Sequence, residues 1–137
     1  MKVLVDTSVW SAALRKKAIS SEERAVVAKL QELIESLQVV TIGPVRQEIL
    51  SGIAGDKQFE LLKTRLSAFE DLPVTSDDYE KAAFFYNICR VNGIQGSYID
   101  FLICAVAANH KLPIFTLDID FSHYAKYLPI TVYSGGK

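Results

Sequence analysis

The feature that most restricts the fold of this chain is a series of short apolar runs, each too brief for a helix. They lie at residues 3–5, 39–42 and 113–117. Runs of this kind are typical of buried strands in a parallel sheet. The segments between them carry apolar side chains at intervals of three and four residues, which predicts helices. We therefore expect an α/β fold, a three-layer sandwich in which a short-stranded parallel sheet is covered by helices.

Local signals predict where the helices begin and end. Ser20 and Glu23 have the spacing of a capping box, so a helix is expected to follow Ser20. Asp77 and Glu80 predict a similar start for a later helix, and Gly43-Pro44 predicts a start with proline in the first turn. The predicted helices cover residues 9–17, 20–37, 43–52, 56–69, 77–92, 101–108 and 121–127, and two further strands are predicted at 72–75 and 130–133.

Composition limits the class of protein. The 137 residues fit one domain, residues 1–137, and half of them are hydrophobic. A formal net charge of −1 argues against a protein that coats nucleic acid nonspecifically, although it does not exclude a nuclease. Cys89 and Cys104 have no CxxC spacing and are expected to be reduced core residues. A charge after three apolar residues does not fit a signal peptide, and no apolar run has membrane-spanning length, so we expect a cytoplasmic protein without a membrane partner.

Four acidic residues are predicted to share one edge of the sheet. Asp6 and Asp118 each follow a strand directly, Glu48 lies in the second turn of a helix that follows a strand, and Asp100 lies in the first turn of its helix. Because the carboxyl ends of parallel strands and the helices that follow them meet at one edge, these side chains are expected to converge. Hard oxygen ligands of this kind suit Mg²⁺ or Mn²⁺.

Each acid also has a structural alternative. Asp100 lies three residues after Ser97 and fits a capping box, Glu48 fits a solvated helix residue, and Asp118 fits an Asp-rich turn. Asp6 fits a strand end before a simple helix cap. Asp100 is, however, the only charge in an apolar helix, where an unpaired carboxylate is costly. The joint placement of the four acids favours a functional cluster.

The motifs around these acids resemble those of the PIN domain family, and within it the VapC-type toxins of toxin–antitoxin pairs. The resemblance rests on four segments in order along the chain: Val-Leu-Val-Asp-Thr-Ser at the start, Pro-Val-Arg-Gln-Glu at 44–48, Gly-Ser-Tyr-Ile-Asp at 96–100, and Thr-Leu-Asp-Ile-Asp-Phe at 116–121. It spans residues 1 to about 133. Cys104 stands where the family usually has a smaller residue such as alanine.

The resemblance implies a metal-dependent endoribonuclease. It implies Asp6, Asp100 and Asp118 as ligands of Mg²⁺ or Mn²⁺, with Glu48 completing the set or orienting the attacking water. Supporting roles are expected for Thr7 and Thr116, whose hydroxyls are expected to hold the carboxylates, and a weaker outer or turn role for Asp120. The candidates for contacts with RNA phosphates, each of which also fits a solvated basic face, are Arg15, Lys16, Lys17 and Arg46. Tyr98 fits either a base-stacking residue or a packed tyrosine.

The resemblance also implies partners. They are an RNA substrate, a small cognate antitoxin and a second copy of the chain in a homodimer. The grooves beside the first two helices, around Trp10, Leu14 and Leu30, are the expected dock for an apolar antitoxin helix, with a basic side chain that reaches the acids. Other functions stay open: an RNA-processing PIN nuclease that is not a toxin, an inactive PIN-fold interaction module, or a phosphatase with Asp6 as nucleophile. The last is disfavoured because Ser8 stands where such enzymes carry a second aspartate.

Overall fold

The computed structural model describes residues 1–14 and 20–134. Within these residues the sheet has three parallel strands, β1 (Val3–Val5), β2 (Val39–Val40) and β3 (Ile114–Phe115), in the order β2-β1-β3. The central strand β1 is buried throughout, as its unbroken apolar sequence predicts. The fold is the predicted α/β sandwich.

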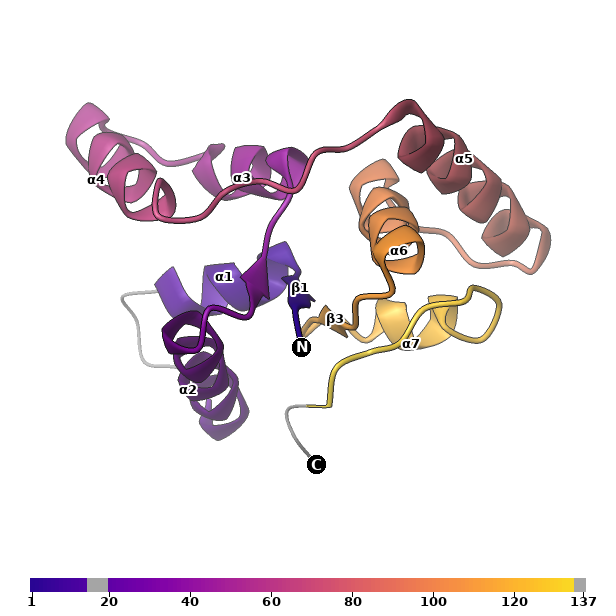
Figure 1. Cartoon of the computed structure of the whole chain (residues 1–137), viewed down its shortest axis with the longest axis horizontal. Coiled ribbons are helices and arrows are strands. Elements are labelled where there is room, and N and C mark those ends of the chain that lie inside the picture. The colour runs from indigo at the N-terminus through magenta and orange to yellow at the C-terminus, as the bar shows by residue number, and fades with distance from the viewer. Residues whose placement is uncertain (15–19, 135–137) are drawn as a thin grey trace.

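The helices cover the sheet from both sides. Figure 1 shows α1 and α2 on one side of the strands and α5 and α6 on the other. The helices within the described residues are α1 (Thr7–Leu14), α2 (Ser21–Glu35), α3 (Gly43–Leu50), α4 (Asp56–Leu66), α5 (Ser76–Val91), α6 (Tyr98–His110) and α7 (Asp120–Tyr124). None of these described helices is long and apolar enough to cross a membrane.

Four of the five predicted strands, all within the described residues, are shorter in the structure or absent from it. β3 covers only Ile114 and Phe115 of the predicted 113–117. β2 ends at Val40, because Thr41 forms only an isolated bridge, with Asp71. Residues 72–75 do not form the predicted strand, and their pairing is limited to the Leu72 N–H, which donates to Thr41 O at 2.9 Å. Residues 130–133 likewise make only an isolated bridge between Val132 and Ile114.

Of the two predicted capping pairs, Ser20 with Glu23 is confirmed and Asp77 with Glu80 is wrong. Ser20 and Glu23 form the predicted box at the start of α2. The prediction for α5 was wrong, because Thr75 caps that helix and Asp78 returns the bond to the Thr75 N–H at 2.9 Å. Asp78 is 2% exposed and also accepts from the Asn109 amide of α6 at 2.6 Å. This carboxylate therefore joins the start of α5 to the end of α6.

Helix α6 forms the centre of the core. Its residues 101–107 are all buried, which confirms the predicted apolar helix. Cys104 of α6 and Cys89 of α5 are buried free thiols, and burial raises the pKa of both. An apolar helix buried on every side fixes the position of the residues at its start, among them Asp100.

We predict that Asp78→Ala lowers the free energy of unfolding by about 1–3 kcal/mol at neutral pH, because it leaves the part-buried donors of Thr75 and Asn109 without their acceptor. Burial alone would raise the pKa of Asp78, but hydrogen bonds from Thr75 and Asn109 outweigh it, and the pKa is lowered. A lowered folded-state pKa stabilises the fold above the unfolded-state pKa, and this contribution is lost as pH falls through the folded-state value. Urea unfolding measured at several pH values should show that the difference in the free energy of unfolding between wild type and variant becomes smaller as the pH falls from neutral to acidic.

Glu80→Ala is the matched control for Asp78→Ala. Glu80 is an exposed acid on the same helix, and it was the wrongly predicted capping partner. Its replacement should change stability by no more than about 0.5 kcal/mol. An equal loss in both variants would contradict the capping role of Asp78.

Candidate active site

Asp6 lies at the carboxyl end of β1 and is 6% exposed. Its backbone N–H donates to Phe115 O at 2.9 Å, so the ends of β1 and β3 lie side by side. Its Oδ2 accepts from Ser8 Oγ at 2.7 Å and from Thr116 Oγ1 at 2.8 Å. The Ser8 backbone N–H adds a longer contact of 3.3 Å. A buried carboxylate is thus held by hydroxyls from two distant segments of the chain.

The same two hydroxyls also fix the segment that carries Asp118. Ser8 Oγ accepts the Leu117 N–H at 2.9 Å, and Thr116 Oγ1 accepts the Asp118 N–H at 2.9 Å. Each hydroxyl therefore donates its proton to Asp6 and accepts a backbone N–H from the chain after β3. Asp118 Oδ1 in turn accepts the Asp120 N–H at 2.9 Å, at the start of α7. One connected network positions Asp6 and Asp118.

Asp100 is held by a different pair of contacts. Ser97 Oγ accepts the Asp100 N–H at 3.0 Å, which is half of the capping box that the sequence allowed. The Asp100 carboxylate does not complete the box at the Ser97 backbone N–H, and its Oδ2 accepts from the Tyr124 hydroxyl of α7 at 2.8 Å. Burial raises the pKa of Asp100, interactions of its carboxylate with the Tyr124 and Ser97 hydroxyls oppose that rise, and the charges of Asp6 and Asp118 add to it. Asp6 and Asp118 are therefore close enough to Asp100 to repel its charge.

The free oxygens of these aspartates are the donors available to a metal ion. Within residues 1–14 and 20–134, the side-chain hydrogen bonds use Oδ2 of Asp6, Oδ2 of Asp100 and Oδ1 of Asp118, and leave the other oxygen of Asp6 and of Asp118 without a protein partner. The Asp100 carboxylate interacts in addition with the Ser97 hydroxyl. Carboxylate oxygens suit Mg²⁺ and Mn²⁺, and a cation would relieve their repulsion. As they stand, no three acidic, His or Cys side chains in that part of the chain are grouped tightly enough to hold a metal ion. The donor chemistry fits such an ion, and binding would draw the carboxylates together.

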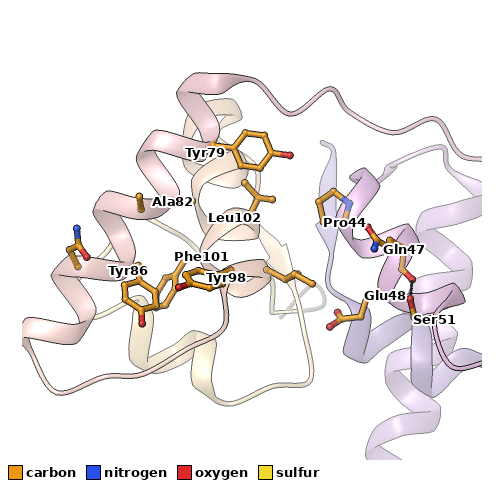
Figure 2. A pocket seen from close by; sticks show the side chains of 13 residues that line it. Pro44, Gln47, Glu48, Ser51, Tyr79, Ala82, Tyr86, Tyr98, Phe101 and Leu102 are labelled. Carbon is orange, nitrogen blue, oxygen red and sulfur yellow. Dashed lines mark hydrogen bonds between the residues drawn. The ribbon is translucent and has the colours of Figure 1, made fainter.

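Glu48 lies apart from the network. It is exposed on α3 and lines a cleft of about 730 Å³ that α3 forms with α5 and α6. Figure 2 shows Glu48 on the α3 side of this cleft, with Tyr98 and Phe101 on the opposite side. Its link to the aspartates is Ile99, which lines the same cleft and precedes Asp100.

Arg46, a predicted phosphate contact, is engaged within the protein. Its guanidinium pairs with Asp71, with Nε 3.1 Å and 3.0 Å from the two carboxylate oxygens. It also donates to the backbone carbonyls of Leu66, at 2.8 Å, and Phe69. Arg46 therefore uses its donors to fasten the chain after α4 onto α3. The other predicted phosphate contacts, Arg15, Lys16 and Lys17, lie outside the described residues.

The structure also bears on the roles expected of Thr7 and of the residues around the predicted antitoxin dock. The buried hydroxyl of Thr7 has no hydrogen-bond partner among the described residues, so Ser8 performs the holding role expected of Thr7. Trp10 and Leu30 are 5% and 2% exposed, and Trp10 packs edge-on against Phe69. These two are core residues, whereas Leu14 is half-buried, so any groove around them would be formed by other side chains of α1 and α2.

Sequence reasoning did not identify Ser8 or Tyr124 as site residues. The available signal for Ser8 was its spacing. It follows Asp6 by two residues, a separation at which local hydrogen bonds to an aspartate carboxylate can form. Tyr124 gave no local signal, because its contact with Asp100 joins segments 24 residues apart. Gly96 permits this contact: a Cβ there would overlap the Tyr124 hydroxyl and come within 2.9 Å of the Phe101 ring.

Comparison with known proteins identifies the family. The sequence model of the PIN domain family matches residues 3–127. The chain belongs to this family. No curated protein sequence matches it closely enough to count as a relative.

Several solved structures share the fold of this PIN domain. FitAcB from Neisseria gonorrhoeae is 24% identical with a TM-score of 0.76, over 97% of each chain. VapBC2 from Rickettsia felis, bound to a promoter DNA fragment, is 16% identical with a TM-score of 0.76, over 97% of this chain and 98% of that one. VapBC-5 from Mycobacterium tuberculosis, a member of the VapBC toxin–antitoxin systems, is 22% identical with a TM-score of 0.67, over 96% of each. At these identities the likeness establishes the fold.

Asp100→Asn should leave the metal-free stability of this PIN domain unchanged or raise it. Asparagine keeps the acceptor for Tyr124 but removes one of three repelling charges. Because the folded-state pKa of Asp100 is raised, its ionisation costs stability as pH rises above the unfolded-state value of about 4, and the variant lacks this cost. Thermal melts in EDTA at several pH values measure the effect. A loss of about 0.5–2 kcal/mol at neutral pH, as expected for a broken helix cap, would contradict it.

Proposed function

We propose that this PIN domain is an Mg²⁺- or Mn²⁺-dependent endoribonuclease and the toxin of a toxin–antitoxin pair. The observation that carries the proposal is the arrangement of Asp6, Asp100 and Asp118. Each is held through one carboxylate oxygen, and the other oxygen of Asp6 and of Asp118 has no protein partner among the described residues. The charges of Asp6 and Asp118 act on Asp100, and like charges brought together in this way are unfavourable unless a cation offsets them.

The chain's own residues would prepare the site before substrate arrives. Ser8 and Thr116 hold Asp6, and Tyr124 holds Asp100, so the free oxygens have fixed origins. Asp6, Asp100 and Asp118 would hold the ion. When bound, such an ion lowers the pKa of a coordinated water and offsets charge on the scissile phosphate. Holding one oxygen of each acid in place limits the movement by which the three carboxylates would have to close around the ion.

Glu48 has a separate part in this proposal. It faces the cleft from α3, is exposed, and is not tied to the aspartate network. A carboxylate free to move is suited to orienting the attacking water and accepting its proton. Asp120 contributes through its backbone N–H, which fixes Asp118, so its side chain stays a weaker candidate.

The toxin assignment is supported by the kind of structures that share this fold. They include VapBC complexes and a toxin–antitoxin complex from Klebsiella pneumoniae. We therefore propose that a small antitoxin is the partner of this chain. We also propose that the chain forms a homodimer and acts in the cytoplasm. The antitoxin would have to bind elsewhere than on Trp10 and Leu30, which are buried.

The direct test is cleavage of single-stranded RNA by the purified protein. Cleavage should require added Mg²⁺ or Mn²⁺ and stop with EDTA. Asp118→Asn should reduce the rate by at least about 100-fold, since removal of a single catalytic electrostatic group typically costs that much. Labelled RNA resolved on a denaturing gel measures it. Expression of the wild type without a partner should also arrest growth, and expression of the variant should not.

Asp56→Asn is the control for this experiment. Asp56 is an exposed aspartate at the start of α4, remote from the network, and its replacement should leave both cleavage and growth arrest unchanged. Cleavage that survives EDTA, or full activity in Asp118→Asn, would contradict the metal mechanism. Cleavage without growth arrest would favour an RNA-processing nuclease.

A further inference from the structure

The cleft that Glu48 lines includes the first turn of α6, the turn that carries Asp100. Tyr98 and Ile99 line it and immediately precede Asp100 in the chain. On the α5 side, Ala82 and Ala83 stand between Tyr79 and Tyr86, and these small side chains leave the space open (Figure 2). The proposed hydrolytic mechanism uses Glu48. It gives no role to the aromatic side chains that line the opposite side of the cleft, which are Tyr79, Tyr86, Tyr98 and Phe101.

Tyr98 is the most exposed of these aromatic side chains. It is 80% exposed, which is unusual for a large aromatic side chain in a folded protein. One side of its ring stacks on Tyr86, with ring centroids 5.4 Å apart and planes 25° apart. Tyr86 meets the Phe101 ring at 5.5 Å, and Phe101 meets Tyr124 at 4.9 Å. Tyr124 donates to Asp100, so the outer ring is supported by a continuous series of rings that ends at a catalytic carboxylate.

A free cation stands beside these rings. Arg90 follows Tyr86 by one turn of α5, so the two side chains share a face of the helix. Both line a smaller hollow of about 290 Å³ that also contains Gln95 and Gly96. Arg90 is exposed, and no carboxylate among the described residues pairs with it. It thus differs from Arg46, whose guanidinium is occupied within the protein.

We propose that this cleft and the adjoining hollow at Arg90 together form a nucleotide subsite, and the proposal rests on the proposed ribonuclease function. A base of single-stranded RNA stacks on the open face of Tyr98, and a backbone phosphate of the same strand pairs with Arg90. The next phosphodiester is thereby directed toward Asp100. Bases that stack on exposed aromatic rings beside a guanidinium are a common mode of single-strand recognition.

The observations favour a nucleotide over a protein helix as the occupant. An apolar helix would use only the apolar part of the cleft lining, whereas a nucleotide would also use the open face of the exposed Tyr98 ring and the unpaired Arg90 of the adjoining hollow. The side-chain amides of Gln47 and Asn87 line the same cleft and provide donors and acceptors for base edges.

The test measures binding apart from cleavage. The protein carries Asp118→Asn and is kept in EDTA, and the probes are a fluorescent oligouridylate and an abasic ribose–phosphate strand of equal length. The parent should bind oligouridylate more tightly than the abasic strand. Adding Tyr98→Ala should weaken oligouridylate binding about 10-fold, the effect of one lost base stack, and leave abasic binding unchanged. Adding Arg90→Ala should weaken both equally and reduce the slope of log K against log salt by about 0.7.

Matched variants separate stacking from general disturbance. Tyr98→Phe should bind as the parent does, since it keeps the ring. Phe84→Ala removes an exposed aromatic side chain of α5 that does not line the cleft, and Arg65→Ala removes an exposed arginine of α4. Both should bind as the parent does.

Several results would overturn the subsite. They are equal affinity for the two strands in the parent, no binding of either, or no effect of Tyr98→Ala. A change of sedimenting mass from dimer to monomer in Tyr98→Ala would instead make this face a contact between copies, and would also overturn it. The binding assay contains no metal and involves no cleavage. A negative binding result therefore does not contradict metal-dependent cleavage. Conversely, a protein that does not cleave RNA can still be measured for binding.

Discussion

The hydrogen bonds from Ser8 and Thr116 to one oxygen of Asp6 are the contacts on which the rest of the site depends. A buried carboxylate is costly unless it is bonded, and these two hydroxyls compensate for that cost. Because each hydroxyl also accepts an N–H of residues 117 or 118, the same contacts join the start of α1 to the chain after β3. The position of Asp118 therefore follows from the way Asp6 is satisfied.

A second anchor acts from the opposite side of the sheet. Helix α6 is buried along residues 101–107, so its first turn has little freedom, and Tyr124 of α7 fixes the Asp100 carboxylate that this turn carries. Close packing at Gly96 makes that contact possible. The result is a set of repelling carboxylates held by rigid elements, an arrangement that costs stability without a cation and supports function with one.

The sequence predicts what depends on local pattern. The strand at residues 3–5, the apolar helix after Asp100, the parallel sheet and the strand-end acids all follow from periodicity and from the edge rule of parallel sheets. The roles of Ser8 and Arg46 do not. Whether Thr7 or Ser8 faces Asp6 is set by how α1 is rotated against the sheet, and Arg46 finds Asp71 only because α4 folds back on α3. Such contacts depend on tertiary packing, which periodicity does not encode.

The central claim is that Asp6, Asp100 and Asp118 form one metal site, and a Mn²⁺ titration followed by electron paramagnetic resonance tests it most directly. The account predicts one tight Mn²⁺ site in the wild type, weakened or lost when any of the three is changed to asparagine. Thr116→Val should weaken it too, since Asp6 loses an anchor, and Asp56→Asn should not. Mn²⁺ binding that is the same in the wild type and in all three aspartate variants would contradict the account.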